Sequence, residues 1–246
     1  MMGVFTVFSR EMLTLRRRFL KYILSGMINP LLLLIAFGWG LGRGIDVEGM
    51  DYIQFIVPGI IALSGMNTSF STVGVALNIS RRYTKTLEVY LTSPITPTAI
   101  ALGKVSSGIV RGLISSIIIA GLGLLFGAQL SLSLSVLVII FLNCFLFASL
   151  GLYIGLKLWA HEDMTNFSTV FLLPMTFLGG TFFPLNNLPA VISGGLYLLP
   201  LTHVSTSLRS AMLGLEFPIV SVVVLIGYSV IFFYLGVRRI NKGDLT

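Results

Sequence analysis

Long uninterrupted apolar stretches limit the fold of this chain more than any other feature of its sequence. An α-helix needs about 20 apolar residues to cross a hydrocarbon layer roughly 30 Å thick. The stretches that approach or exceed this length cover residues 24–41, 53–77, 103–126, 134–157, 165–183 and 217–236. Backbone polar groups in lipid must be paired within the protein, and a helix pairs its own. We therefore expect an all-α membrane protein with six transmembrane helices.

The residue pattern inside these stretches argues against a membrane β-barrel. Barrel strands alternate apolar and polar residues over short segments. The run "LLLLIAF" at residues 31–37 is instead apolar on every face. The chain of 246 residues is 55% hydrophobic, which is more than a soluble core requires. A single transmembrane domain over residues 1–246 is the expected organisation.

Basic residues gather in alternate connections between the apolar stretches. The formal net charge is +7, and most of the cations lie in four regions. These regions hold Arg10, Arg16, Arg17, Arg18 and Lys21, then Arg81, Arg82, Lys85 and Lys104, then Lys157, and finally Arg238, Arg239 and Lys242. Lys and Arg accumulate on the cytoplasmic side of membrane proteins. This predicts a multi-pass protein of the cytoplasmic (inner) membrane, with both termini cytoplasmic, membrane lipids around it and no nucleic acid partner.

Residues 3–22 have the pattern of an amphipathic helix. Apolar residues recur at spacings of three and four, which places them on one helical face, at Phe5, Phe8, Met12, Leu15 and Phe19. Such a helix lies on a membrane surface with its apolar side buried. We expect an interface helix on the inner leaflet. It serves either as an anchor alone or also as a contact for a cytoplasmic partner.

A second amphipathic segment, residues 79–92, connects the second and third apolar stretches. Its apolar side chains share one helical face, at Ile79, Tyr83, Leu87 and Tyr90. Arg82, Lys85 and Glu88 project elsewhere, and the Ser-Pro pair at residues 93–94 ends the helix. A topology signal requires the cations but not an ordered apolar face. We therefore expect a short cytoplasmic helix whose role goes beyond topology.

Residues 184–209 are apolar but too broken to cross a membrane. Proline interrupts them at Pro184, Pro189 and Pro200. Short helices that dip in from the outer face fit this pattern, provided that protein or water covers their backbone. His203 and Arg209 are available to satisfy polar groups, and a proton-handling role for His203 is a second option. We expect an external re-entrant segment.

Polar and aromatic residues gather within the second and fifth apolar stretches. The candidates for a substrate cavity are Asn67, Phe70 and Ser71 in the second stretch and Asn166, Phe171 and Met175 in the fifth. Hydroxyl and amide groups would bind the polar part of a ligand, and the apolar side chains its hydrophobic part. The alternative interpretation is hydrogen bonding between helices, at roughly 0.6 kcal/mol per contact. The two interpretations are compatible.

The sequence carries no signature of catalysis or of an energy source of its own. The phosphate-binding motif that ends in Gly-Lys-Ser or Gly-Lys-Thr does not occur. His161 and His203 fall in connections on opposite sides, so neither a metal site nor a catalytic residue is predicted. Carboxylates lie in or beside connections, whereas ion-coupled carriers keep them in mid-membrane. Arg111 is the only ionisable residue well inside a stretch. We therefore expect no enzymatic activity and no cofactor in this chain.

Three motifs that follow one another along the chain carry a resemblance to a known family. They read "TLEVYLTSPITPTAIALGK", "GGTFFPLNNLP" and "LPLTHVSTSLRSAMLG". They resemble the type-2 ATP-binding-cassette (ABC) exporter permeases, a family that includes drug, nodulation-factor and polysaccharide exporters. The similarity covers essentially the whole chain.

The resemblance implies a complex in which transport and ATP hydrolysis belong to different subunits. It implies two permease copies, as a homodimer or with a similar partner, and two copies of a separate cytoplasmic ATPase that binds ATP and Mg. The segment between the second and third spans would be the coupling helix that contacts the ATPase, with Arg81, Arg82, Tyr83, Lys85, Leu87, Glu88 and Tyr90. ATP binding would move this helix and switch the cavity from inward-facing to outward-facing.

The leading hypothesis is the transmembrane subunit of an ATP-driven exporter. It would move a hydrophobic or amphiphilic substrate, such as a drug, a lipid or a lipid-linked glycan, across the cytoplasmic membrane by alternating access. An ATP-independent carrier or channel for small amphiphiles would instead transport without a partner. A membrane-embedded enzyme or an assembly scaffold would show its activity without transport.

Overall fold

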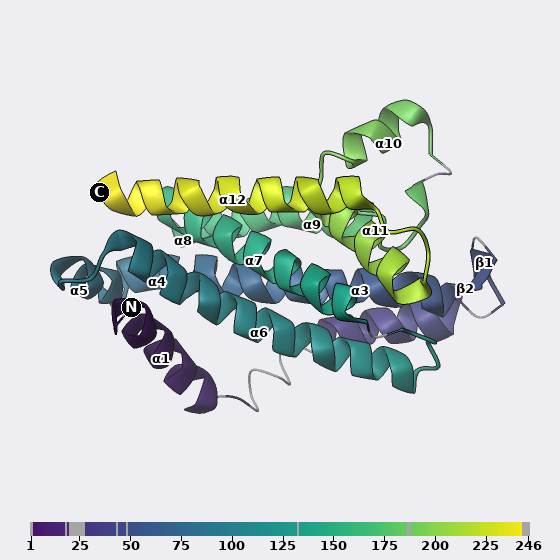
Figure 1. Ribbon diagram of the computed structural model, residues 1–246, viewed down its shortest axis with the longest axis horizontal. Helices are drawn as coiled ribbons and strands as arrows, with labels where there is room; N and C mark the ends of the chain where they lie inside the picture. Colours follow the sequence, from purple (N-terminus) through teal and green to yellow (C-terminus); the bar gives the residue numbers. More distant parts are fainter. Residues whose placement is uncertain are drawn as a thin grey trace.

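Helices make up most of the chain in the computed structural model, which describes residues 2–17, 19, 28–42, 44–47, 49–131, 133–185 and 188–242. The elements, with η for a π-helix, are α1 (Met2–Arg17), η1 (Leu34–Leu41), β1 (Asp46–Val47), β2 (Met50–Asp51), α3 (Tyr52–Phe70), η2 (Ser71–Val75), α4 (Ala76–Arg82), α5 (Thr86–Thr92), α6 (Pro97–Leu125), α7 (Leu134–Lys157), α8 (His161–Phe167), η3 (Ser168–Leu172), α9 (Leu173–Leu178), α10 (Ala190–Leu196), α11 (Pro200–Leu213) and α12 (Ile219–Lys242). The two strands pair in an antiparallel hairpin at one end of the molecule (Figure 1).

Four helices within the described residues are long and apolar enough to cross a membrane. The first is Tyr52–Arg81, in which α3, η2 and α4 follow one another without a break, and the others are α6, α7 and α12. They lie side by side in an elongated bundle (Figure 1). The predicted all-helical architecture, with several helices that could cross a membrane, is therefore confirmed.

The other two predicted spans are helical but shorter in the part of the chain that the structure describes. Within residues 24–41, helix is present from residue 28 to residue 41. Within residues 165–183, helix ends at residue 178, and the acidic residues Glu162 and Asp163 of α8 lie just before the stretch begins. The count of six spans stays a prediction.

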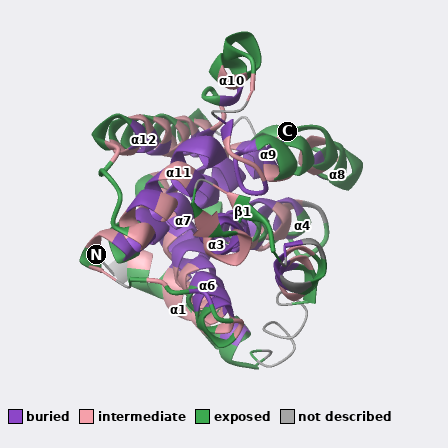
Figure 2. Cartoon of the chain, turned by 90° about the vertical axis from the view of Figure 1, so that its right-hand side faces the viewer, coloured by how far each residue is buried: buried purple, intermediate pink, exposed green. Residues whose placement is uncertain are grey.

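The core of the bundle is α3, with α6 and α7 packed against it. Large side chains of α3 such as Phe55, Ile60 and Met66 are fully buried, as is Phe147 of α7. Figure 2 shows this buried centre, with α12 and α10 near the outside. Many apolar side chains of α12 are exposed, including Val220. A continuous apolar surface of this kind is suited to contact with lipid.

Two helices meet backbone to backbone where η2 crosses α7. A Cβ atom added to Gly151 would lie 2.7 Å from the Phe70 carbonyl oxygen. A Cβ atom added to Gly155 would lie 2.7 Å from the carbonyl oxygen of Gly74. Small residues at a spacing of four let membrane helices approach this closely. Gly74, Gly151 and Gly155 form a contact that we call the glycine seam.

The helix predicted for residues 3–22 is present as α1, which packs along α6, and its place at a membrane interface stays a prediction. Val7 is fully buried, and Gly103 of α6 lies directly against it. Phe5, from the predicted apolar face, is instead exposed. The apolar residues of α1 are thus divided between α6 and the outer surface. Residues 18 and 20–22 of the prediction lie outside the described residues.

The single helix predicted for residues 79–92 is wrong, because the chain forms two helices, α4 and α5. Lys85 lies between them with a φ of 49°, in the left-handed region, where a right-handed helix cannot continue. The predicted apolar face is divided as well. Ile79 and Tyr83 are exposed, whereas Leu87 and Tyr90 are buried.

The break in this segment has a packing reason. Asn78 of α4 donates from Nδ2 to the carbonyl oxygens of Leu158 and Trp159, which directly follow α7. Leu87 of α5 is buried in the core cluster, and Tyr90 of α5 hydrogen-bonds to α1. One straight helix cannot satisfy both sets of contacts, so the chain turns at Lys85.

The external segment predicted for residues 184–209 contains two short helices, α10 and α11. They lie toward the end of the bundle opposite to both chain termini (Figure 1). α11 inserts among α3, α7 and α12, and its Leu201, Val204 and Leu208 are fully buried. Its depth relative to a membrane stays a prediction.

Arg209 of α11 ties this segment to the core. Its Nε donates to the Phe55 carbonyl oxygen over 3.2 Å, and its Nη2 donates to the Gly180 carbonyl oxygen over 2.8 Å. The guanidinium carbon also lies 3.7 Å from the centre of the Phe55 ring. Arg209 therefore joins α11 to α3 and to the turn after α9.

Replacing Arg209 with alanine should lower the free energy of unfolding by about 3 kcal/mol, because hydrogen bonds to charged groups contribute roughly 1.5–3 kcal/mol each. The measurement is thermal unfolding in detergent, followed by maleimide labelling of Cys144, the single and buried cysteine. Arg238→Ala removes the same charge from an exposed position of α12 and is the control. Equal midpoints for the two variants would contradict the role of Arg209.

Candidate functional site

A cavity of about 780 Å³ lies between α3, α6 and the helices α8 to α9. Its lining comprises Asn29, Pro30, Leu33, Ile60, Leu63, Ser64, Asn67, Thr68, Ser71, Thr72, Val75, Ala76, Ile79, Arg111, Ile114, Ser115, Ile118, Thr165, Ser168, Thr169, Leu172, Leu173, Thr176 and Phe177. The volume falls within the range of small-molecule sites. This cavity is the candidate functional site.

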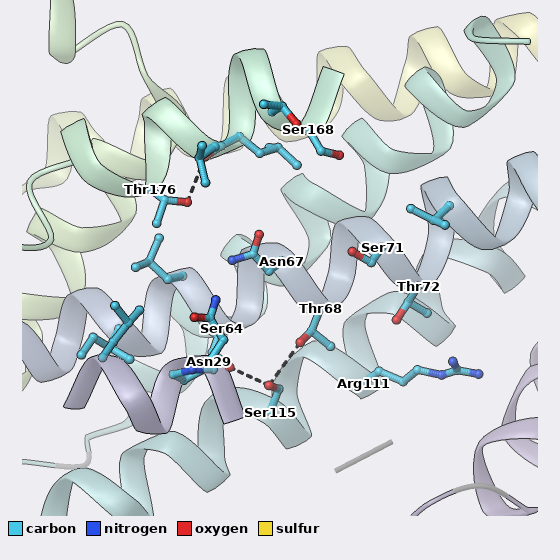
Figure 3. A pocket seen from close by; sticks show the side chains of 18 of the residues that line it. Asn29, Ser64, Asn67, Thr68, Ser71, Thr72, Arg111, Ser115, Ser168 and Thr176 are labelled. Atoms are coloured by element: carbon cyan, nitrogen blue, oxygen red, sulfur yellow. Dashed lines mark hydrogen bonds between the residues drawn. The ribbon is translucent and has the colours of Figure 1, made fainter. Parts of the chain in front are cut away.

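One wall of the cavity is a band of hydroxyl and amide groups on α3 and η2. Their positions are three, four or five residues apart or adjacent, so they lie on one side of the helix (Figure 3). The residues of this band are Ser64, Asn67, Thr68, Ser71 and Thr72. Ser115 of α6 extends the band. Its Oγ lies 2.6 Å from Ser64 Oγ and accepts a hydrogen bond from Thr68 Oγ1 over 3.2 Å.

The facing wall presents hydroxyl oxygens from α8, η3 and α9. Ser168 Oγ donates to the Met164 carbonyl oxygen, and Thr176 Oγ1 donates to that of Leu172. Each hydroxyl hydrogen is thus used within its own helix, and the oxygen keeps lone pairs that accept hydrogen bonds. Leu172, Leu173 and Phe177 supply apolar surface between these hydroxyls. The cavity therefore suits a ligand with both polar and apolar parts.

Both walls contain a π-helical turn, η2 on one side and η3 on the other. Thr72 comes from the first and Thr169 from the second, and both line the cavity. Pro174 follows η3 and has no N–H to donate to the Val170 carbonyl, so a regular α-helical ladder cannot run through it. Single π-turns in helices occur frequently at functional sites.

The predicted cavity residues are only partly brought together. Asn67 and Ser71 line the cavity. Phe70 and Met175 are buried outside its lining, and Phe70 stacks on Phe167 with ring centres 5.8 Å apart. Asn166 and Phe171 are exposed and also lie outside the lining. The reason is helical geometry, because residues adjacent in sequence point about 100° apart around an α-helix.

Sequence reasoning missed the contribution of α6 to the cavity. Arg111 and Ser115 are four residues apart on this helix and both line the site. The pair of polar residues at helical spacing in an apolar stretch was the available signal. A role in ligand contact stays a prediction for every residue of the lining.

The residues predicted for ATPase coupling do not form one surface. Tyr83, Lys85 and Glu88 are exposed, whereas Leu87 and Tyr90 face inward. The side chain of Arg82 lies outside the described part of the chain. Arg81 points back to the end of α7, where Nη1 donates to the Leu156 carbonyl oxygen over 2.8 Å and the guanidinium carbon lies 4.7 Å from the Trp159 ring centre. A cation at the C-terminus of a helix stabilises its dipole, so Arg81 supports the fold.

The predicted external residues have structural contacts. Pro189 precedes α10, Pro200 begins α11, and Pro184 is half-buried before them. His203 Nε2 donates to the Tyr197 carbonyl oxygen over 2.7 Å, and Nδ1 lies 3.1 Å from Ser221 Oγ. Both ring nitrogens therefore have hydrogen-bond partners within the fold.

Among the described residues, no group of three His, Cys, Asp or Glu side chains is placed to hold a metal ion. The long apolar helices and the cavity between them are those of a multi-pass membrane protein with a cavity between its helices. Residues 2–213 match the family described as ABC-2 type transporter, and the chain belongs to this family. The predicted resemblance is confirmed.

Characterised relatives align with nearly the whole chain. An inner membrane transport permease, YadH of Escherichia coli K12, is 28% identical over 242 residues, which are 97% of this chain and 94% of that protein. Nodulation protein J of Rhizobium meliloti is 30% identical over 245 residues, which are 96% of this chain and 92% of that protein. The chain is thus a transmembrane transporter subunit of the ABC-2 permease family.

Proposed function

We propose that this chain is the transmembrane subunit of an ATP-driven exporter that moves a hydrophobic or amphiphilic substrate, such as a drug, a lipid or a lipid-linked glycan. The observation that carries the proposal is that one family match, over residues 2–213, includes both the cavity and the exposed helix α5. Energy enters through a partner, since the chain has no phosphate-binding motif. A separate ATPase binds ATP and Mg.

The composition of the cavity supports an amphiphilic substrate. Ser64, Thr68 and Ser115 offer hydroxyl groups on one side, and Leu172 and Phe177 offer apolar surface on the other. Pockets that bind amphiphiles combine a mostly apolar lining with a few polar groups that fix orientation. The substrate occupies this cavity and is carried by alternating access between two permease copies.

Helix α5 is the proposed docking element for the ATPase. It lies at the same end of the bundle as both chain termini (Figure 1). Tyr83, Lys85, Glu88, Val89 and Leu91 are exposed there, and we call them the docking face. Exposed apolar side chains that lie together mark interaction surfaces more often than isolated ones do. This end of the molecule is cytoplasmic, as the gathering of Lys and Arg around it indicates.

Packing contacts connect α5 to the helices that line the cavity. Tyr90, on the inner side of the same short helix, accepts a hydrogen bond from Arg10 of α1 over 3.0 Å. α1 in turn packs along α6, which lines the cavity. A displacement of α5 by the ATPase would therefore also displace α1 and α6. In this way ATP binding would bias the equilibrium between the inward-facing and outward-facing states.

Co-purification tests this function. The tagged chain, expressed in its own host with its native partners, should yield a complex with two permease and two ATPase copies. That complex should hydrolyse ATP only with Mg and should transport an amphiphile in liposomes only with ATP. Transport by the purified chain alone, with no ATPase present, would establish the ATP-independent carrier instead.

A further inference from the structure

Three charged side chains meet at the end of the cavity nearest to α1. Glu11 of α1 places Oε1 2.5 Å from Lys104 Nζ and Oε2 3.8 Å from Arg111 Nη2. Arg111 Nη2 also donates to the Glu11 carbonyl oxygen over 3.2 Å. Arg111 belongs to the lining of the cavity, and Figure 3 shows it extending along α6 on the side of Thr72.

In the part of the chain that the structure describes, one carboxylate in this cluster faces two cations, so the three side chains carry one net positive charge. Their side chains are 6% (Lys104), 13% (Arg111) and 17% (Glu11) exposed. The cavity lining described above contains no carboxylate, and the nearby Arg10, which is exposed and bonded to Tyr90, adds a further cation. A nearly buried net charge is costly unless a counter-charge accompanies it.

The geometry distinguishes the roles of the two cations. Lys104 is outside the cavity lining and holds Glu11 at the shorter distance. Arg111 is in the lining, and its carboxylate contact is the longer one. A guanidinium has five N–H donors in a planar fork, which matches phosphate and carboxylate oxygens. Arg111 can therefore keep its contacts to Glu11 and still bind an anion in the cavity.

We propose that the cavity binds an amphiphile with an anionic head group, a phosphate or a carboxylate, which the Arg111 guanidinium recognises. The hydrocarbon part lies along Ile114, Ile118 and Leu172, and hydroxyls of the band on α3 and η2 bind uncharged polar groups of the head. Glu11 and Lys104 position Arg111. The proposal rests on the proposed function only in taking the cavity as the substrate site, because binding itself requires neither ATP nor a partner.

Binding is measured with the purified full-length chain in a neutral detergent. The probes are dioctanoyl phosphatidylglycerol, the zwitterionic dioctanoyl phosphatidylcholine and inorganic phosphate, each titrated and followed by native mass spectrometry. The wild type should bind phosphatidylglycerol about tenfold more tightly than phosphatidylcholine, in line with one charge-assisted contact. Inorganic phosphate should bind more weakly than either lipid, because it lacks the hydrocarbon part.

Variants of the charge cluster test how much the Arg111 guanidinium contributes to lipid binding. Arg111→Gln should remove the preference for phosphatidylglycerol, and Arg111→Lys should retain part of it. Glu11→Gln removes the internal counter-charge and should tighten phosphatidylglycerol binding by roughly threefold to tenfold. Arg16→Gln removes an equal charge from an exposed position of α1 and should leave both affinities unchanged. If Cys144 labelling shows that Arg111→Gln does not fold, the affinities of Arg111→Lys and Glu11→Gln test the proposal instead.

Three results would overturn the proposal. The first is that the wild type and Arg111→Gln prefer phosphatidylglycerol over phosphatidylcholine to the same degree. The second is that inorganic phosphate binds as tightly as phosphatidylglycerol. The third is an Arg111→Gln protein that loses only its association with the ATPase. That result would mean that a carboxylate of the ATPase is the counter-charge of the cluster. ATP-driven transport of an anionic amphiphile by Arg111→Gln at the wild-type rate would refute this inference and leave the proposed function intact.

Discussion

Replacing Gly151 with alanine should destabilise the fold by about 3 kcal/mol, at the upper end of typical overpacking costs. The new Cβ would lie 2.7 Å from the Phe70 carbonyl oxygen and 3.0 Å from the Gly74 nitrogen. Both neighbours are backbone atoms, so no side chain can rotate away. The helices must separate, and that disrupts the glycine seam along its length. Thermal unfolding in detergent, followed by labelling of Cys144, should show a clearly lower midpoint.

Gly121→Ala is the matched control for this variant. Gly121 also lies within a membrane helix, α6, and a Cβ added there meets nothing within 4 Å. Its midpoint should stay level with the wild type or rise slightly, because alanine favours helix over glycine. A Gly151→Ala protein that is as stable as Gly121→Ala would show that η2 and α7 are not in close contact.

Replacing Val89 with aspartate should reduce the amount of ATPase that co-purifies by at least about tenfold, because an unpaired carboxylate within an apolar contact costs more than the roughly 1–3 kcal/mol of an unpaired neutral polar group. Val89 is 61% exposed and lies on the docking face of α5. The substitution leaves Leu87 and Tyr90, the inward anchors of the helix, unchanged. The fold should therefore persist while ATP-driven transport is lost.

Val191→Asp provides the comparison. Val191 is also exposed, at 89%, and lies on α10 toward the opposite end of the bundle. Its ATPase yield and its transport should match those of the wild type. If Val89→Asp retains full ATPase association and coupled transport, the docking face is elsewhere and the assignment of α5 fails.

The helical character of the chain could be predicted because hydropathy over 20 residues depends only on composition. The turn at Lys85 could not. The spacing of Ile79, Tyr83, Leu87 and Tyr90 is the same for one helix and for two, and only the opposed attachments of α4 and α5 require the break. Periodicity therefore identified an apolar pattern correctly and its shared face wrongly.

The cavity shows the same limit at the level of side chains. Asn67 and Ser71 are four residues apart and line the site together, but Phe70 between them points into the core. Which side of a membrane helix faces a cavity depends on its neighbours, and the apolar residues on both sides look alike in the sequence. The contribution of Arg111 depends on α6 lying beside α3, a tertiary contact that one sequence does not reveal.

The glycine seam has a mechanical consequence for the two cavity walls. η2 and α7 interlock through backbone atoms, so the wall formed by α3 and η2 is fixed to the core and resists sliding. The wall formed by α8, η3 and α9 touches the rest of the bundle mainly through α4, η2 and α11 near its two ends. Fewer packed contacts must be broken to shift it. We therefore expect the wall formed by α8, η3 and α9 to move more than the wall formed by α3 and η2 if the cavity changes shape during transport.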